Sequence, residues 1–466
     1  MRRMLPVAVL LGVGSVGAFV GCGGGSATLG PEGGAGSSGG SAGAAPDASG
    51  AAGGASDGSA QPDVGGTAGT ASGDGGQDVD ATSPSDGAVD GAADSAPTDA
   101  SATTATWCGR GVDVPGAVPA SGFCLKQYAR VAEARAMVVA PTGDLFVSAP
   151  AAATPGGASG GPGAIVLLSD DDDDGVAEAH AFLSGIQDVH GLALGGGYLY
   201  FTTQKSVFRT PYTDGQRVAA GAPEDLGLPQ GYASGGRWTH GLARSAGGQL
   251  ITSRGAYATC GSTTGGEIST VGTGGALTTM ASGFRNPMYL RCHRSADVCA
   301  AMELGEDLAI GAHEKMIMLR PNTYYGFPCC YTKSAPVPNS AANSMCGDVT
   351  EEEATFPLSD TPFGFDWEPG GWPAPYKNGI FVALHGSAYS SPSWQGAAVV
   401  YAATNPTTHM PTQDWQPFQT GFGPSGSALE RPADIAFSSD GRMFIADDQS
   451  GRVYWMAPLT LAAPSQ

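Results

Sequence analysis

A histidine and an arginine lie three residues apart in the stretch GGRWTHGLA, residues 235–243, just ahead of an apolar run. Histidine titrates near neutrality and can take a proton from a substrate. Arginine stays protonated and suits anionic groups such as carboxylates. His240 is therefore a candidate catalytic base or a structural histidine at the start of a strand. Arg237, its near neighbour, is the second candidate catalytic residue.

Other polar residues stand in the same place, immediately before an apolar strand, elsewhere in the chain. One such residue would signify little, since repeated folds often keep polar groups there for hydrogen bonds between repeats. Several cations at equivalent positions predict a site for an anionic ligand, because equivalent loops of a closed repeat converge in space. The set comprises Arg135, His190, Arg237, His240, Arg285, Asn286 and Arg431.

An acidic run, SDDDDDG, is a candidate for metal binding. Asp170, Asp172, Asp174 and Gly175 match the start of a D-x-D-x-D-G calcium loop, but no Glu stands at the twelfth position. Adjacent carboxylates repel one another unless they are neutralised or well solvated. The run predicts either a solvated turn or a weak structural calcium site.

The candidate residues belong to a repeat of short apolar strands that begins near Ala134. In each copy a strand, a Gly or Asp-Gly turn, a second strand and a third strand follow one another, which favours β-hairpins. Six copies spaced by about 40–60 residues predict a β-propeller. The first copy reads ARAMVVAPTGDLF, the fifth YKNGIFVAL and the last RPADIAFSSDGRMFIADD. The expected fold is all-β, a six-bladed propeller whose innermost strands line a central channel.

The N-terminal segment has the features of an export signal. Residues 1–22 carry two arginines, then an apolar stretch, and end in AFVGC. This ending resembles a bacterial lipobox with Cys22 as the lipidated residue; an ordinary secretory signal is the alternative. Gly, not Asp, follows the cysteine, which argues against retention in the inner membrane. We expect an exported protein anchored by lipid to the cell envelope, in the outer membrane.

Residues 23–106 form a tether between the anchor and the propeller. They contain no Lys, Arg or aromatic residue and consist almost entirely of Gly, Ala, Ser, Asp, Pro and Thr. Such a segment cannot bury enough apolar surface to offset its chain entropy, so we expect disorder. The propeller is assigned to residues 107–466. The net charge of −21 and the lack of a basic patch exclude nucleic acid as a partner.

Eight cysteines follow Cys22, and an even count in an exported chain indicates disulfides. We expect local bridges Cys108–Cys124 and Cys292–Cys299. The adjacent cysteines 329 and 330 would be strained if joined to each other, so each should pair with one of cysteines 260 and 346. The sequence leaves open which takes which.

Four stretches, in order, resemble the quinoprotein sugar dehydrogenases: the glucose, sorbosone and pyranose dehydrogenase propellers. They are GFRNP (283–287), YYGFPCC (324–330), NGIFVALHGS (378–387) and RPADIAFSSDGRMFIADD (431–448). The resemblance implies a six-bladed propeller that uses pyrroloquinoline quinone (PQQ) and calcium to oxidise sugars or related alcohols and aldehydes. It also implies an external electron acceptor, since the chain has no C-x-x-C-H haem motif.

The resemblance assigns cofactor roles to several positions. The quinone carries three carboxylates, so it needs cations and amide donors. Gly305 and Glu306 in MELGED match the turn whose carbonyls bind calcium, a metal that prefers oxygen ligands. His385 stands where glucose-oxidising members have a lysine. The expected quinone-binding residues are His190, Arg285, Asn286, His385 and Arg431.

The base position departs from the family pattern. In the sorbosone-type branch the motif resembles Gly-His-x-Thr-Arg, whereas this chain reads Gly-Arg-Trp-Thr-His, so Arg237 takes the base position. Three outcomes are open: a loop adjustment lets His240 reach the substrate, the propeller binds quinone with little activity, or the quinone site is lost. A shift of three residues moves an extended side chain by about 10 Å.

Two functions compete on this evidence. One is a PQQ- and calcium-dependent dehydrogenase of sugars or aldehydes. The other is a non-catalytic propeller lipoprotein that binds carbohydrate or a protein partner. Calcium-dependent lactone hydrolysis, a third use of such propellers, is not favoured, because no set of carboxylates and asparagines stands at the blade starts.

Overall fold

The computed structural model describes residues 105–150, 162–229, 237–261, 266–306, 312–333, 335–336, 346–387, 396–424 and 426–464. The chain divides into a unit Met1–Asp94 and a compact unit Ser95–Gln466, and all described residues belong to the second. The expected signal, Cys22 and nearly all of the tether lie outside the described residues. Within them, no helix is long and apolar enough to cross a membrane.

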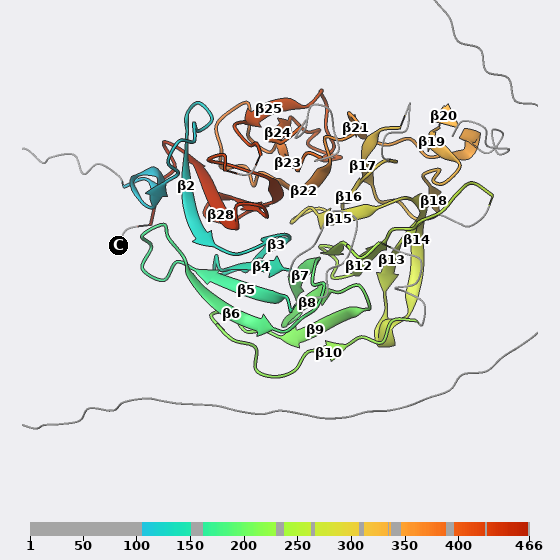
Figure 1. The fold of residues 1–466 in the computed structure, drawn as a ribbon, viewed down its shortest axis with the longest axis horizontal. Helices are drawn as coiled ribbons and strands as arrows, with labels where there is room; N and C mark the ends of the chain where they lie inside the picture. Colours follow the sequence, from blue (N-terminus) through green and yellow to red (C-terminus); the bar gives the residue numbers. More distant parts are fainter. Residues whose placement is uncertain are drawn as a thin grey trace, which may run out of the picture. The chain divides into compact units, whose positions relative to one another are not determined.

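Six sheets form a ring (Figure 1). In five of them the innermost strand is the first of the sheet in the chain, and in the sixth the innermost strand comes from the C-terminal part. The inner strands contact one another in a closed ring, in the order β3, β7, β11, β15, β22, β26 and back to β3. This is a six-bladed propeller, so the expected fold class is confirmed. Its helical segments among the described residues are three short 3-10 turns: η1 (Trp107–Gly109), η2 (Thr273–Gly275) and η3 (Cys346–Asp348).

The first three blades follow the chain from inside to outside. Blade 1 consists of β3 (Met137–Val139), β4 (Leu145–Ala149), β5 (Ala164–Ser169) and β6 (Glu178–Ser184). Blade 2 consists of β7 (Leu192–Gly195), β8 (Tyr198–Thr202), β9 (Val207–Pro211) and β10 (Glu224–Asp225). Blade 3 consists of β11 (Leu242–Arg244), β12 (Leu250–Arg254), β13 (Gly266–Val271), β14 (Leu277–Phe284) and, parallel to β14, β18 (Thr323–Tyr324).

Blades 4 and 5 follow the same order, with one small additional sheet. Blade 4 consists of β15 (Pro287–Cys292), β16 (Cys299–Glu303), β17 (Glu314–Met318) and β21 (Ala354–Phe356). The additional hairpin pairs β19 (Cys330–Thr332) with β20 (Ala335–Pro336). Blade 5 consists of β22 (Pro362–Trp367), β23 (Ile380–Leu384), β24 (Ala398–Ala402) and β25 (Gln416–Gln419).

Blade 6 closes the ring by joining the two ends of the propeller. Its inner strands come from the C-terminus, and its outer strands come from the start of the domain (Figure 1). β2 pairs antiparallel with β28, with Phe123 opposite Pro458 and Arg130 opposite Arg452. The strands are β26 (Pro432–Phe437), β27 (Met443–Asp447), β28 (Arg452–Pro458), β2 (Phe123–Arg130) and β1 (Val112–Asp113).

The fifth blade corrects the expected repeat. The sequence pattern predicted that the fifth copy begins at Tyr376. In the structure the inner strand of this blade is the earlier β22, and Tyr376 precedes the second strand, β23. All six residues of β22 are buried, and the strand PFGFDW has a single polar side chain, Asp366, so its alternating pattern is weak. A loop rather than a tight turn joins it to β23, which removes the hairpin signal as well.

Four disulfides staple the domain. Cys108–Cys124 and Cys292–Cys299 are present, as expected from their spacing. Cysteines 329 and 330 pair separately, which is also confirmed. The structure decides the open question: Cys260 pairs with Cys329, and Cys330 pairs with Cys346.

Candidate active site

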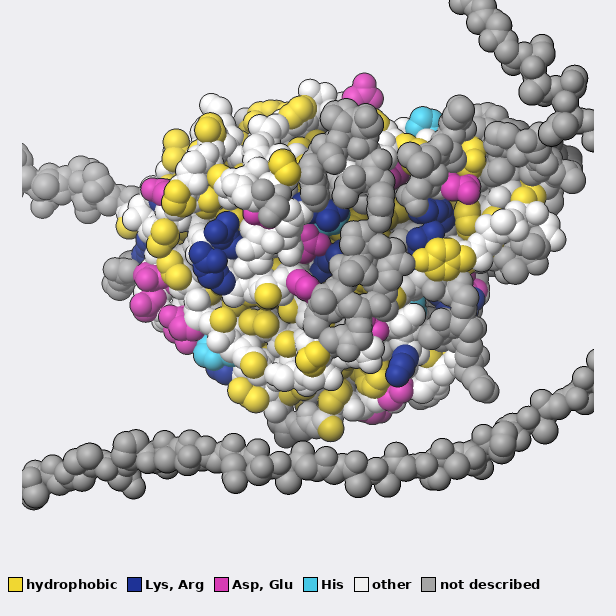
Figure 2. Space-filling model, in the orientation of Figure 1, with side chains coloured by type: hydrophobic (Ala, Val, Ile, Leu, Met, Phe, Trp, Pro, Cys, Tyr) yellow, Lys and Arg dark blue, Asp and Glu magenta, His cyan; other side chains and the backbone are white. Residues whose placement is uncertain are grey.

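The residues expected to converge do stand at matching places in the ring. Arg135, His190, His240 and Arg285 each lie two positions before an inner strand, and Arg431 lies one position before β26. We call this end of the channel the rim. In Figure 2, several basic and acidic side chains lie near the centre of the face in view.

One buried carboxylate, Asp448, connects three of the rim side chains. Arg135 Nε lies 3.0 Å from its Oδ2. His385 Nε2 lies 3.1 and 3.0 Å from its two oxygens. Arg431 Nη2 donates to His385 Nδ1 over 2.7 Å, and also to the carbonyl of Gly386. Blades 1, 5 and 6 are therefore linked by one chain of hydrogen bonds.

This network defines the protonation of His385. Because Arg431 can only donate, Nδ1 accepts, and Nε2 carries the proton that it donates to Asp448. Burial lowers the pKa of His385 to about 4, and the positive charge of Arg431 adds to this effect. The negative charge of Asp448 opposes it. Burial alone would raise the pKa of Asp448, but His385, Arg135 and Arg431 hold it well below its usual range.

Burial opposes the positive charge of the Arg431 guanidinium. Burial and the neighbouring charge of Arg135 lower the pKa of Arg431 to about 10, although Asp448 and Asp447 oppose this. Its backbone is fixed, since the N–H of Arg431 donates to the buried Asp447 over 3.0 Å. Negative charge from an anion bound beside Arg431 would oppose this lowering of its pKa.

Aromatic rings surround these polar groups. Phe363 of β22 stacks on His385, with ring centroids 4.0 Å apart and planes 12° apart. The guanidinium of Arg135 lies 5.6 Å from the Phe363 ring and 6.0 Å from the Trp238 ring. Tyr289 of β15 contacts Phe363 from the other side, with centroids 5.4 Å apart. Such rings exclude water and strengthen the electrostatics of the site.

His190 lies deep in the rim on blade 2. Its Nδ1 lies 3.2 Å from the carbonyl oxygen of His240, and the side chain is fully buried. Its Nε2 and the Tyr289 hydroxyl are both buried and have no hydrogen-bond partner among the described residues. Burial, followed by the charge of Arg135, lowers the pKa of His190 to about 3.

His240 lies behind the rim. Its ring is completely buried, and Nε2 contacts the carbonyl of Arg237, three residues earlier, over 2.9 Å. Burial lowers its pKa to about 4. Arg237 stacks instead over the exposed Tyr257, with its guanidinium 4.1 Å from the ring centroid. This geometry favours the structural reading of the His240 side chain over the expected role as a base.

Arg285 and Asn286 stand at the start of blade 4. The buried Glu303 accepts the N–H of Arg285 over 2.7 Å, and burial raises the pKa of this carboxyl. The hydroxyl of Thr239 lies 3.4 Å from Asn286 Oδ1, which joins blades 3 and 4. Gly255 has no room for a side chain here, because an added Cβ would lie 2.7 Å from the Arg285 carbonyl oxygen.

The expected calcium turn lies beside this pair. β16 ends at Glu303, opposite Pro287, and the next residue, Leu304, donates to the carbonyl of Asn286 over 3.1 Å. Gly305 and Glu306 follow directly in the chain. The assignment of calcium to them stays a prediction.

A cavity of about 770 Å³ begins below the rim and follows the channel. His190 and Tyr289 line it near the rim. Further along, Arg291 pairs with Asp434 over 3.0 Å, and Arg294 with Asp366 over 3.2 Å. Positive and negative side chains are thus balanced in this part of the channel.

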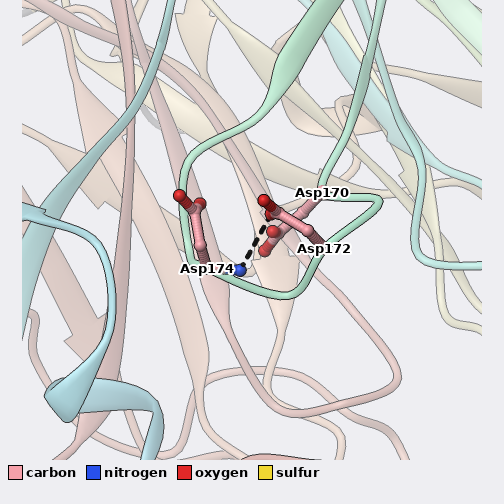
Figure 3. A group of neighbouring side chains, drawn as sticks. All are labelled: Asp170, Asp172 and Asp174. Carbon is pink, nitrogen blue, oxygen red and sulfur yellow. Dashed lines mark hydrogen bonds between the residues drawn. The ribbon is translucent and has the colours of Figure 1, made fainter. Parts of the chain in front are cut away.

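The acidic turn between β5 and β6 is separate from the rim. The carboxylates of Asp170, Asp172 and Asp174 lie within 4.8 Å of one another (Figure 3). Asp170 is neutralised by Arg442 over 3.0 Å, and the backbone N–H of Asp174 donates to Asp172. The turn therefore satisfies much of its charge without a cation, as a solvated acidic turn does.

Sequence reasoning missed three residues of this site: Asp448, Tyr289 and Phe363. Asp448 ends the last quoted motif, in IADD, so its position after a second strand was the available signal. Tyr289 follows the quoted GFRNP by two residues and was treated as part of the strand. Phe363 belongs to the strand that the repeat pattern missed.

No family model and no curated protein sequence matches the chain. Solved structures do. It is similar to the holo form of the pyranose dehydrogenase PQQ domain from Coprinopsis cinerea, with a TM-score of 0.60 and 18% identity over 74% of this chain and 99% of that one. In fold, the chain resembles the PQQ-dependent sugar dehydrogenases.

Two further structures support the shared fold. A Trichoderma reesei carbohydrate-active enzyme of family AA12, in its calcium structure, has a TM-score of 0.58 and 17% identity over 74% of this chain and 98% of that one. A glucose dehydrogenase has a TM-score of 0.51 and 14% identity over 71% of this chain and 98% of that one. At these identities the likeness establishes the propeller, and the chemistry must be argued from the rim.

Proposed function

We propose that the protein is an oxidoreductase that uses PQQ and calcium to oxidise a sugar or a related alcohol or aldehyde, passing electrons to an external acceptor. The observation that carries the proposal is the network at the rim in which Arg135 pairs with Asp448, while Arg431 donates to His385 and His385 in turn bonds to Asp448. A ligand with several carboxylates supplies the negative charge that lowers the cost of burying the two arginines.

The donor set fits the quinone. Arg135, Arg431 and Arg285 can bind its carboxylates, and the amide of Asn286 can bind a ring oxygen. Beside this donor set, His190 Nε2 and the Tyr289 hydroxyl have no hydrogen-bond partner among the described residues, and they mark a place where the substrate rather than the quinone would complete the hydrogen bonding. The carbonyls of Gly305 and Glu306 have the oxygen chemistry that calcium prefers.

When bound, the quinone would accept hydride, and calcium would polarise the receiving carbonyl. The protein side chains have the other tasks. The Asp448 network fixes the arginines in position, so the cofactor binds to preorganised cations. Phe363, Tyr289 and Trp238 exclude water around the reacting atoms. A side chain must also take the proton of the substrate hydroxyl.

A binding and turnover experiment tests the proposal. PQQ and calcium are added to the purified protein, and cofactor binding is measured by absorbance and fluorescence, followed by dye-linked oxidation of a panel of sugars. We expect binding at micromolar quinone and turnover of at least one sugar. Absence of binding would overturn the proposal, and binding without turnover would support the non-catalytic propeller instead.

A variant locates the site. Arg285→Ala should weaken quinone binding, whereas Arg209→Ala should not, because Arg209 lies on the outside of blade 2 in an exposed pair with Glu224. Equal affinities for the two variants would remove Arg285 from the cofactor site.

We also propose that the chain is exported and held at the cell envelope through Cys22. Four disulfides support an oxidising compartment. Mass spectrometry of the N-terminal peptide should find a lipidated cysteine, and Cys22→Ala should release the protein from membranes. A Cys22→Ala protein that stays in the membrane fraction would contradict the anchor.

A further inference from the structure

Oxidation of an alcohol removes a proton as well as a hydride, and the rim must supply the acceptor of that proton. Arg237 stays protonated and cannot act as a base. His240 is buried behind the rim with Nε2 on a backbone carbonyl. His385 has both ring nitrogens engaged, one by Arg431 and the other by Asp448.

His190 differs from these residues because the hydrogen bond of its ring involves Nδ1 and leaves Nε2 available to accept a proton. A carbonyl oxygen only accepts, so the contact with the His240 carbonyl requires the proton on Nδ1. The neutral ring therefore carries its lone pair on Nε2. That atom has no hydrogen-bond partner among the residues described.

The ring is held firmly in this orientation. The His240 carbonyl also accepts from the hydroxyl of Thr202 over 2.7 Å, and the N–H of His190 donates to the Thr202 carbonyl over 3.0 Å. Tyr289 and Trp238 contact the imidazole edge-on, with centroids 5.1 and 5.8 Å away. A fixed tautomer aimed at a cavity is the arrangement that a general base needs.

We propose that Nε2 of His190 accepts the proton of the substrate hydroxyl, an inference that rests on the quinone-dependent oxidation proposed above. The O–H bond breaks with its proton going to Nε2, the C–H bond breaks with hydride going to the quinone, and a C=O bond forms. The external acceptor would then take the two electrons, and two protons, one from Nε2 and one that had been transferred as hydride, would be released to water. His190 lines the cavity and its Nε2 is buried, so the substrate would reach this atom from the cavity after a small displacement of the surrounding side chains.

Charge around His190 responds to the cofactor. The charged and titratable described groups that face it are Arg135 from blade 1, His240 from blade 3 and Tyr289 from blade 4. Carboxylates bound at Arg135 would offset its positive charge, so quinone binding should make His190 a stronger base.

A measurement on the wild-type chain tests the geometry without turnover. Imidazole ¹⁵N NMR of the full-length protein, with and without PQQ and calcium, reports the protonation of each ring nitrogen. We expect an unprotonated Nε2 and an increase of about one unit or more in the pKa of His190 when quinone binds. A proton on Nε2 in the neutral ring, or no response to bound quinone, would overturn the proposal.

A variant tests the chemistry. His190→Gln should keep quinone affinity within about threefold and lose about 10²–10⁴-fold in kcat, the range typical of a lost general base. The control is His180→Gln on the outer strand of blade 1, where His180 contacts Ser169; it should retain both properties.

The outcomes separate the two proposals. A wild-type protein that binds no quinone overturns the proposed function. A wild-type protein that binds and turns over, with a His190→Gln variant of equal kcat, overturns the base alone. If His190→Gln does not fold, the NMR measurement on the wild-type protein still decides the matter.

Discussion

The rim has two halves that differ in charge: one contains charged side chains, and the other contains aromatic rings and neutral imidazoles. The charged half, formed by Arg135, His385, Arg431 and Asp448, joins blades 1, 5 and 6 by side-chain hydrogen bonds. The aromatic half, formed by His190, Trp238, His240 and Tyr289, joins blades 2, 3 and 4 by ring contacts and bonds to backbone.

The difference lies in what each half leaves for a ligand. In the charged half, positive charge is only partly offset, which suits an anion. In the aromatic half, imidazoles are kept neutral, which suits proton transfer. Both kinds of group have perturbed pKa values because of burial, and clusters of such groups are typical of active sites. A cofactor would bind to one half and the substrate would react against the other.

The largest expected effect is the loss of the carboxylate that holds the charged half together. Asp448→Asn removes the charge that pairs with the partly buried Arg135 and accepts from the buried His385, and it should lower the free energy of unfolding by about 3–5 kcal/mol. Urea denaturation measures the change. Asp414→Asn, on an exposed aspartate, is the control and should be neutral. A small effect at Asp448 would mean that the charged half is solvated.

Acid should destabilise both halves. The pKa values of His190, His240 and His385 lie at about 3, 4 and 4 in the folded chain, below the ordinary 6.5. Below about pH 6.5 these histidines bind protons in the unfolded chain but not in the folded chain, so the free energy of unfolding decreases as the pH is lowered. Each histidine contributes up to about 1.4 kcal/mol per pH unit down to its folded pKa.

Urea unfolding at several values between about pH 7.5 and 4.5 measures this dependence. His385→Gln should reduce the slope by one proton in the charged half while leaving the aromatic half unchanged. An unchanged slope in the His385→Gln variant would show that His385 is protonated in the folded protein, because buried carboxyls with raised pKa values, such as Asp434, oppose the histidines equally in both proteins.

A smaller effect is expected on cofactor binding alone. Arg431→Gln removes a charged donor from the charged half and should weaken PQQ binding about 10- to 100-fold, in line with about 1.5–3 kcal/mol for a charged hydrogen bond. Fluorescence titration measures it, and Arg130→Gln, on an exposed arginine of β2, is the control. Unchanged affinity would place the quinone away from this half.

The smallest effect is expected at Arg237. Arg237→Ala removes a partly exposed contact with Tyr257, worth about 0.5–1 kcal/mol. Stability should fall by no more than this, and quinone affinity should stay within about threefold. A large loss of turnover would show that Arg237 reaches the substrate and that the base position of the family motif is in use.

Much of this architecture could be predicted from the sequence. Turn glycines and paired apolar strands predicted six blades, and the expected positions of Arg135, His190, His240 and Arg285 do come just before inner strands. Gly143 and Gly441, with φ of 95° and 89°, occupy the turns that mark the first and last copies. The strand β22 and its residue Phe363 could not be recognised in the sequence, because a fully buried strand shows little alternation of apolar and polar residues.

The pairing of rim residues could not be predicted. Asp448 is distant in sequence from Arg135, and only closure of the ring by β2 and β28 brings the first and last blades together. The motif exchange at Arg237 and His240 was visible, but the direction in which each side chain points was not. Both depend on the path of the loop before β11.

The sequence by itself determined a propeller, its disulfide-forming cysteines and a set of cations and histidines at equivalent positions, because periodicity and turn chemistry are local properties. Only the tertiary structure decided which histidine can act. Burial and the carbonyl of His240 set the tautomer of His190, and those are contacts between blades. A histidine becomes a base or a structural residue through the neighbour that holds its other nitrogen.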